Sequence, residues 1–219
     1  MMSVRVEYEI EVKDRHGKVI KREKGESKSL LKNFVACLLA IMKATVQTES
    51  EYTGTGGAEA TVMDVTGAEQ TIWGGWRGTG NYLYGGGWPM PINAPDDDDS
   101  YGIVVGKGDA PVSAEDYALD DQIAHGTASG QLDYGTHAFE DVVVEDKVSK
   151  FRVSRTFTNV SGASVTVKEI GIIAWNYFRD RGKVHNNVKF LIVRDVLTSP
   201  TSIPDGASLN VRYTFSVEA

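Results

Sequence analysis

Four adjacent aspartates, Asp96 to Asp99, are the residues of this chain whose type and spacing are best suited to binding a metal ion. Adjacent carboxylates repel one another unless water or a hard cation screens them, and Ca²⁺ prefers oxygen ligands of this kind. The run lacks the alternating acids and the final glutamate of an EF-hand loop. Two interpretations therefore stand, a solvated acidic loop or a calcium site formed by Asp96, Asp97, Asp98 and Asp99, and no other cofactor is expected.

Known catalytic motifs do not fit the rest of the chain. The segment Gly102–Gly108 resembles a phosphate-binding loop, but a tyrosine and a glycine stand where a glycine and a hydroxyl residue are needed. No serine lies in a Gly-x-Ser-x-Gly elbow. The histidines lack the spacing of a metal centre; they are His16, His125, His137 and His185. We expect a protein that is not an enzyme, with a glycosidase-like carboxylate pair in a cleft as the weaker alternative.

A glycine- and tryptophan-rich segment, residues 53–91, contains 11 of the 23 glycines and three of the four tryptophans. Long loops of this kind are usually functional or mobile. Its aromatic residues could form a platform for sugar rings, as in a receptor- or glycan-binding module, or fill a small core or a subunit contact. The platform residues would be Trp73, Trp76, Tyr82, Tyr84 and Trp88.

The net charge of −7 hides a strong asymmetry along the chain. Residues 1–43 carry +4, residues 44–95 carry −4, residues 96–146 carry −13 and residues 147–219 carry +6. The acidic middle argues against nucleic acid as a partner, and no apolar run approaches the ~18 residues of a membrane span. One hypothesis is that the basic ends of one subunit pair with the acidic middle of the next. Assembly would then weaken as the salt concentration rises. Pairing within one subunit, or apolar contacts between subunits, is the alternative.

Alternating apolar and charged residues predict mainly β structure. The clearest strands are residues 4–12, with a return strand at 19–22, and the C-terminal residues 209–217. Eight or more strands at roughly ten-residue spacing along the whole chain indicate one domain over residues 1–219. We expect an antiparallel β-sandwich of jelly-roll or immunoglobulin-like type with an insertion at 45–100. Short strands are expected at 103–105, 132–134, 142–144, 151–157, 165–167, 170–175, 191–193 and 196–197, with a charged loop at 179–187.

One helix is expected at residues 28–44, where apolar residues recur at intervals of three and four. Its C-terminal half is apolar nearly all round, so it must be covered by a sheet or by a neighbouring subunit. The single cysteine, Cys37, excludes an internal disulfide and is expected to be a small core residue. The predicted subunit interface consists of Leu30, Leu31, Phe34, Val35, Leu38, Leu39 and Met42.

Three pieces of the chain carry a family resemblance. The first is a basic strand followed by Ser29–Phe34 and an apolar helix, and the second is Tyr101–Leu119 continued by Gln122–Gly126 and Gly130–Gly135. The third is Arg155–Gly171, then Arg194–Leu197 and the C-terminal alternating strand. Together they resemble virion structural proteins of tailed phages and related prokaryotic viruses, over most of the chain except residues 44–95. The resemblance implies a β-rich homo-oligomeric virion component, in a capsid, tail or surface appendage, that contacts other virion proteins. It also implies synthesis in the host cytoplasm. A host surface glycan is the alternative ligand, and neither nucleic acid nor membrane is expected as a partner.

Overall fold

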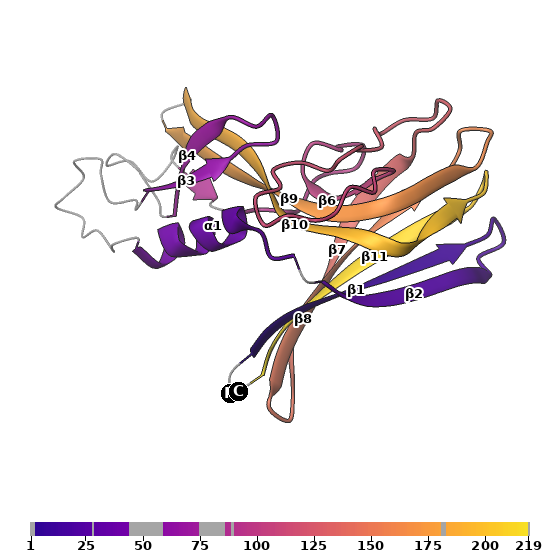
Figure 1. Cartoon of the computed structure of the whole chain (residues 1–219), viewed down its shortest axis with the longest axis horizontal. Coiled ribbons are helices and arrows are strands. Elements are labelled where there is room, and N and C mark those ends of the chain that lie inside the picture. Colours follow the sequence, from indigo (N-terminus) through magenta and orange to yellow (C-terminus); the bar gives the residue numbers. More distant parts are fainter. Residues whose placement is uncertain are drawn as a thin grey trace.

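The chain is mainly β, with antiparallel sheets and one short helix (Figure 1). The computed structural model describes residues 3–27, 29–43, 59–74, 86–88, 90–180 and 183–218. The elements in these residues are β1 (Ser3–Lys13), β2 (Val19–Ser27), α1 (Lys32–Lys43), β3 (Glu59–Met63), β4 (Glu69–Trp73), β5 (Gly86–Trp88), β6 (Gly102–Gly106), β7 (Asp133–Glu145), β8 (Val148–Thr158), β9 (Val165–Asp180), β10 (Lys183–Ile203) and β11 (Ser208–Glu218).

The largest sheet has five antiparallel strands in the order β2-β1-β11-β8-β7. The two terminal strands lie side by side over their whole length, with Ser3 opposite Glu218 and Lys13 opposite Ser208. Both chain ends therefore lie together at one end of this sheet (Figure 1). Because side chains alternate between the two faces of a strand, the apolar residues of these strands share one face, here called the inner face.

A second antiparallel sheet contains β10, β9 and β5, and β6 also pairs with β9. Its residues share one hydrophobic core with the inner face of the five-stranded sheet. Contacts between the sheets include the Tyr213 hydroxyl, which donates to Asp195 on β10. The long β9–β10 hairpin extends beyond this core toward the separate hairpin β3–β4 (Figure 1).

The helix α1 begins at Lys32 rather than at residue 28. Leu30 and Leu31 precede it, because Leu30 forms a bridge with Val193 and the Leu31 amide donates to the Ile192 carbonyl. These contacts attach the chain to β10 before the helix starts. The buried residues of α1 are Asn33, Cys37 and Ala40.

Several strands are longer than the alternation predicts. The expected strands at 132–134 and 142–144 belong, apart from Leu132, to the single strand β7, whose pairing with β8 shifts register at two irregular points. The predicted charged loop at 179–187 was wrong over much of its length, since β9 continues to Asp180 and β10 starts at Lys183. Polar residues are tolerated there because backbone pairing, with Asn187 opposite Tyr177, holds the strands together.

Candidate functional site

The aspartate run surrounds a buried arginine. Arg155 lies on the inner face of β8 and is 1% exposed. Burial lowers the pKa of the Arg155 guanidinium. Tyr134, followed by Asp98, Asp96 and Asp99, raises this pKa, so the nearby carboxylates partly balance the buried charge. The guanidinium donates to the backbone carbonyls of Pro95, Asp98, Tyr101, Ile103 and Gly135. The acidic run thus folds around a cation that belongs to the chain itself.

Two of the four aspartates have structural hydrogen bonds. The Asp98 Oδ1 atom accepts from the Ser100 amide at 2.8 Å, and the Asp99 Oδ2 atom accepts from the His125 amide at 2.7 Å. Asp96 and Asp97 have exposed side chains. A calcium site on this run stays a prediction. Of its four aspartates, only Asp97 belongs to a group of three potential metal ligands among the described residues.

One group of potential metal ligands stands out among the described residues, Asp97, His125 and Asp133. Asp97 Oδ1 lies 3.6 Å from Nε2 of His125, whereas Asp133 Oδ1 lies 3.7 Å from Nδ1. The Tyr134 amide donates to Nδ1 at 3.2 Å, so this nitrogen is engaged by the backbone. Since the two carboxylates face different ring nitrogens and Nδ1 already accepts a hydrogen bond from the backbone, we assign the group as a cluster of polar side chains that the local backbone holds in place.

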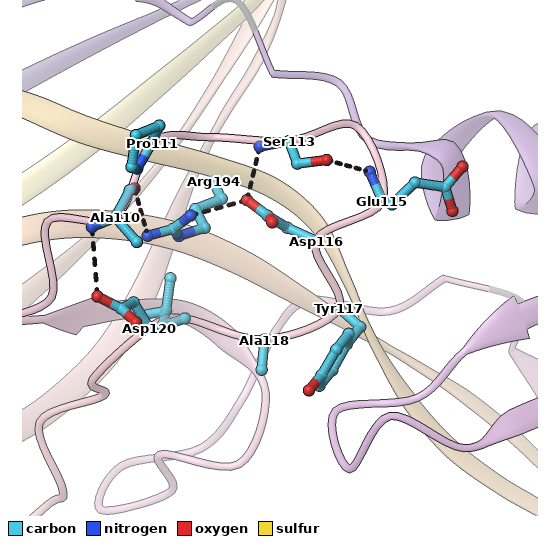
Figure 2. A pocket seen from close by; sticks show the side chains of 10 residues that line it. Ala110, Pro111, Ser113, Glu115, Asp116, Tyr117, Ala118, Asp120 and Arg194 are labelled. Atoms are coloured by element: carbon cyan, nitrogen blue, oxygen red, sulfur yellow. Dashed lines mark hydrogen bonds and ion pairs between the residues drawn. The ribbon is translucent and has the colours of Figure 1, made fainter.

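A buried ion pair attaches the 107–121 loop to the second sheet. Glu169 on β9 is fully buried, and its Oε2 accepts from Nε of Arg194 on β10 at 2.9 Å. The other guanidinium nitrogens donate to Asp116 at 2.7 Å and to the Ala110 carbonyl at 3.0 Å (Figure 2). Backbone amides of Gly108, Asp120 and Asp121 donate to the same Glu169 carboxylate. The aspartates that line the cavity of about 320 Å³ beside Arg194, Asp116 and Asp120, therefore already accept hydrogen bonds from the chain itself.

Only some residues of the predicted aromatic platform lie among the residues that the structure describes. Trp73 lies in β4, where its Nε1 donates to Glu59 at 3.2 Å. Trp88 lies in β5 opposite Tyr177 of β9, and only its backbone is described. Trp76, Tyr82 and Tyr84 lie outside the described residues. The glycan platform therefore stays a prediction.

The inner face of the five-stranded sheet is apolar beyond the point where the second sheet covers it. Along β1, Val6 is 2% exposed but Val4 is 56% exposed. Along β8, Val153 is fully buried but Phe151 is 37% exposed. Val217 on β11 is 39% exposed at the same end. The alternating pattern thus continues for one further row of apolar side chains that nothing in the described chain covers.

These side chains line a groove of about 390 Å³. Phe151 and Phe215 stack in the groove with ring centroids 5.0 Å apart and planes 7° from parallel. The opposite wall comes from other parts of the chain, with Phe34 of α1 and the adjacent Met90 and Ile92. We name this surface the apolar groove and define it by Val4, Phe34, Met90, Ile92, Val142, Phe151, Ile192, Phe215 and Val217.

The predicted helix interface separates into buried and exposed residues. Leu31 is fully buried within the chain, so its placement in a subunit interface was wrong, and Leu30 is partly buried against the core. Phe34 lines the apolar groove. The remaining four are exposed: Val35 58%, Leu38 43%, Leu39 47% and Met42 75%. The helix therefore presents an uncovered apolar side next to the groove.

The buried charged residues were missed by sequence reasoning, although a signal was available. Arg155 has the same parity as Phe151, Val153 and Phe157, which predicts an inward side chain on an apolar face. Glu169 has the same parity as Val167 in the same way. A charged residue on the apolar parity of a strand is a candidate for a buried, hydrogen-bonded charge.

No family model, no curated protein and no solved structure matches this chain. Within the described part of the chain, no helix has the length and apolar character that crossing a membrane would require. The apolar groove and the exposed side of α1 are thus the features on which a function can be argued.

Proposed function

We propose that this chain is a non-enzymatic structural subunit that self-assembles by burying the apolar groove against a second copy of itself. The observation that carries the proposal is the row of apolar side chains beyond the edge of the second sheet, 37% to 56% exposed at Phe151, Val217 and Val4. Contiguous exposed apolar surface of this kind marks interaction sites in soluble proteins. Following the family resemblance, we propose that the assembly is a virion component, in a capsid, tail or surface appendage.

A second copy suits the groove because the same chain also carries a projecting apolar element. The tip of the β7–β8 hairpin exposes Val142 (66%), Val143 (45%) and Val144 (68%) on its two faces. The hairpin tip lies at the same end of the sheet as the chain termini (Figure 1). Insertion of the tip of one copy into the groove of another would bury both apolar surfaces, and closed symmetry repeats such a contact around a ring.

The same proposal includes the finer features of the expected assembly. One core shared by the two larger sheets supports a β-sandwich, and its jelly-roll or immunoglobulin-like type stays a prediction. Assembly with other virion proteins would follow synthesis in the host cytoplasm.

The test changes the hairpin tip and measures the oligomeric state. We expect sedimentation velocity of the wild-type chain to show a concentration-dependent oligomer. The double substitution Val143→Asp and Val144→Asp, at tip residues outside the groove, should weaken self-association at least tenfold, because each introduced carboxylate would lose its water in the contact. Both valines are exposed in the single chain, so the thermal unfolding midpoint should change little.

Val160→Asp is the matched control. Val160 is 47% exposed and follows the opposite end of β8, away from the hairpin tip. It should leave the oligomer unchanged. A wild-type chain that stays monomeric at its highest soluble concentration, or equal weakening by the control, would rule out assembly through this surface.

A further inference from the structure

One wall of the apolar groove is a segment without helix or strand, residues 90–95, here called the strap. Its Met90 and Ile92 side chains line the groove. Among the described residues, one main-chain hydrogen bond reaches the strap, from the Trp175 amide of β9 to the Pro91 carbonyl at 3.0 Å. Two of its six residues are prolines, which have no amide proton to donate. The strap therefore depends on side chains of neighbouring elements for its position.

Three side chains donate to the backbone carbonyls of the strap. They are Tyr101 to Asn93 at 3.2 Å, His137 to Ala94 at 3.1 Å and Arg155 to Pro95 at 3.1 Å. Ala94 is 1% exposed, so its carbonyl is held inside the core. Arginine and tyrosine keep their protons well above neutral pH, whereas histidine changes its charge and its hydrogen-bonding capacity in acid. The contact of His137 is thus the one that acid can break.

His137 is neutral in this arrangement, because its Nε2 atom accepts from the Ile103 amide of β6 at 2.8 Å. The proton of the ring is then on Nδ1, which donates to Ala94. The ring lies directly against Gly102, where an added Cβ would lie 2.3 Å from its Cε1 atom and 2.5 Å from its Nε2 atom. A protonated ring would direct an N–H group at the Ile103 amide, which is itself a donor. The ring can therefore take up a proton only by leaving its place between the strap and β6.

The charged group that acts on His137 is the Arg155 guanidinium of β8. Burial, and then this positive charge, lowers the pKa of His137 to about 4. The carboxylates of Asp98, Asp96 and Asp99 act on Arg155. From the strap and from β6 the ring meets uncharged backbone groups. An open strap would free the ring from burial and from the guanidinium, so acid favours the open state.

We propose that the strap is an acid-sensitive device: when His137 takes up a proton, the strap is released from β7 and one wall of the apolar groove opens. The released segment carries Met90 and Ile92 away from the groove. Self-association through the groove should then weaken in acid, and this second step rests on the proposed function. The release of the strap takes place within one chain and does not depend on assembly.

Hydrogen exchange, read at single amides of the full chain by mass spectrometry, tests the release. The Ile103 amide reports the His137 contact, and the Trp175 amide reports the strap itself. A pKa of about 4 in the closed state and one near 6.5 in the open state predict that opening rises roughly 50-fold from pH 7 to pH 4.5, after correction for the intrinsic exchange rate. The Asn159 amide, which donates to the Ala207 carbonyl, should change much less. An equal loss of protection at all three amides, or no loss at Ile103 and Trp175, would overturn the proposal.

The variant His137→Gln supplies an amide group that can accept from Ile103 and donate to Ala94 without titrating. It should remove the acid response of the Ile103 and Trp175 amides. His16→Gln, at an exposed turn histidine, is the matched control and should keep that response. A full acid response in His137→Gln would contradict the role of His137, and if this variant does not fold, the exchange pattern of the wild type decides alone.

Sedimentation velocity at the two pH values separates the strap from the assembly. The wild-type oligomer should dissociate at least partly at pH 4.5, and His137→Gln should dissociate less. Strap release in a chain that is monomeric at both pH values would support the strap and contradict the proposed function. Strap release in an oligomer that stays intact would overturn the link between the strap and assembly.

Discussion

At the scale of single residues, buried polar side chains rather than surface motifs organise this protein. Arg155 holds the 95–103 segment and the start of β7 through five carbonyl contacts, and Glu169 with Arg194 holds the 107–121 loop. Removing one partner of such a network leaves the other partner buried and unsatisfied, which typically costs several kcal/mol. Parts of the acidic middle are therefore attached to two buried cations, Arg155 and Arg194, of the basic C-terminal segment.

His137 makes a prediction at this scale. Its Nε2 accepts from the Ile103 amide at 2.8 Å, which leaves Nδ1 to donate to the Ala94 carbonyl at 3.1 Å. Burial, followed by the charge of Arg155, lowers the pKa of His137 to about 4. The unfolded chain takes up a proton near pH 6.5. Stability is therefore fully present above that pH and is lost as the pH falls toward about 4, by roughly 3 kcal/mol at most.

Urea unfolding at pH 7 and at pH 4.5 measures this loss. His137→Gln should show a smaller drop between the two pH values, because glutamine does not titrate. His16→Gln, at an exposed turn histidine, should keep the wild-type drop. Equal pH dependence in His137→Gln and the wild type would contradict the assignment.

At the scale of elements, the helix α1 is held against the sheets by a small buried surface. Its buried side is Asn33, Cys37 and Ala40, and it packs on β3, β4 and β10. The Asn33 amide donates to the Met63 carbonyl at 2.8 Å and accepts from the Met63 amide at 3.0 Å. This polar clamp, together with the Leu30 bridge to Val193, orients the helix so that its other apolar side faces outward.

The docking of α1 can be tested through its cysteine. Burial raises the pKa of the Cys37 thiol to about 12, so at neutral pH it reacts only when the helix moves away from the sheet. Asn33→Ala removes the clamp and should increase the rate of labelling by a thiol reagent at least tenfold. Lys32→Ala, which removes only the exposed ion pair with Glu115, should leave the rate nearly unchanged. Wild-type labelling as fast as that of the urea-unfolded chain would disprove the docked position.

At the scale of the whole molecule, charges from distant segments meet within one chain. Arg152 of the basic C-terminal segment pairs with Glu140 of the acidic middle at 2.8 Å, and Lys168 pairs with Asp109 at 2.8 Å. Of the two alternatives for the charge asymmetry, these contacts favour pairing within the subunit. In the proposed assembly, the contacts between subunits would then be mainly apolar.

Assembly should therefore resist salt. Rising sodium chloride screens exposed ion pairs but leaves apolar contacts intact or slightly stronger. We expect sedimentation velocity to give the same oligomer from low to high salt, with no loss of self-association. Dissociation at high salt would restore the interpretation in which basic and acidic segments of neighbouring subunits pair.

Local alternation was enough to predict the mainly antiparallel β structure and the two terminal strands, because the period of two depends only on neighbours within each strand. The apolar run of the helix likewise predicted Cys37 as a core residue, and Cys37 is buried. The length of β7, β9 and β10 was not predictable, since pairing with a distant strand sustains them through polar stretches. Parity could have shown that Arg155 points inward, but not which carbonyls it meets.

The sequence by itself thus determined which side chains share a face, and the tertiary structure alone decided which of them are covered. Val4 and Val6 are the same residue type on the same strand and face, yet one is 56% exposed and the other 2%. The difference depends on where the second sheet ends, which is set by contacts between residues far apart in the chain. The position of the aspartate run around Arg155 was likewise decided by the tertiary structure, because only folding brings β8 to residues 95–98.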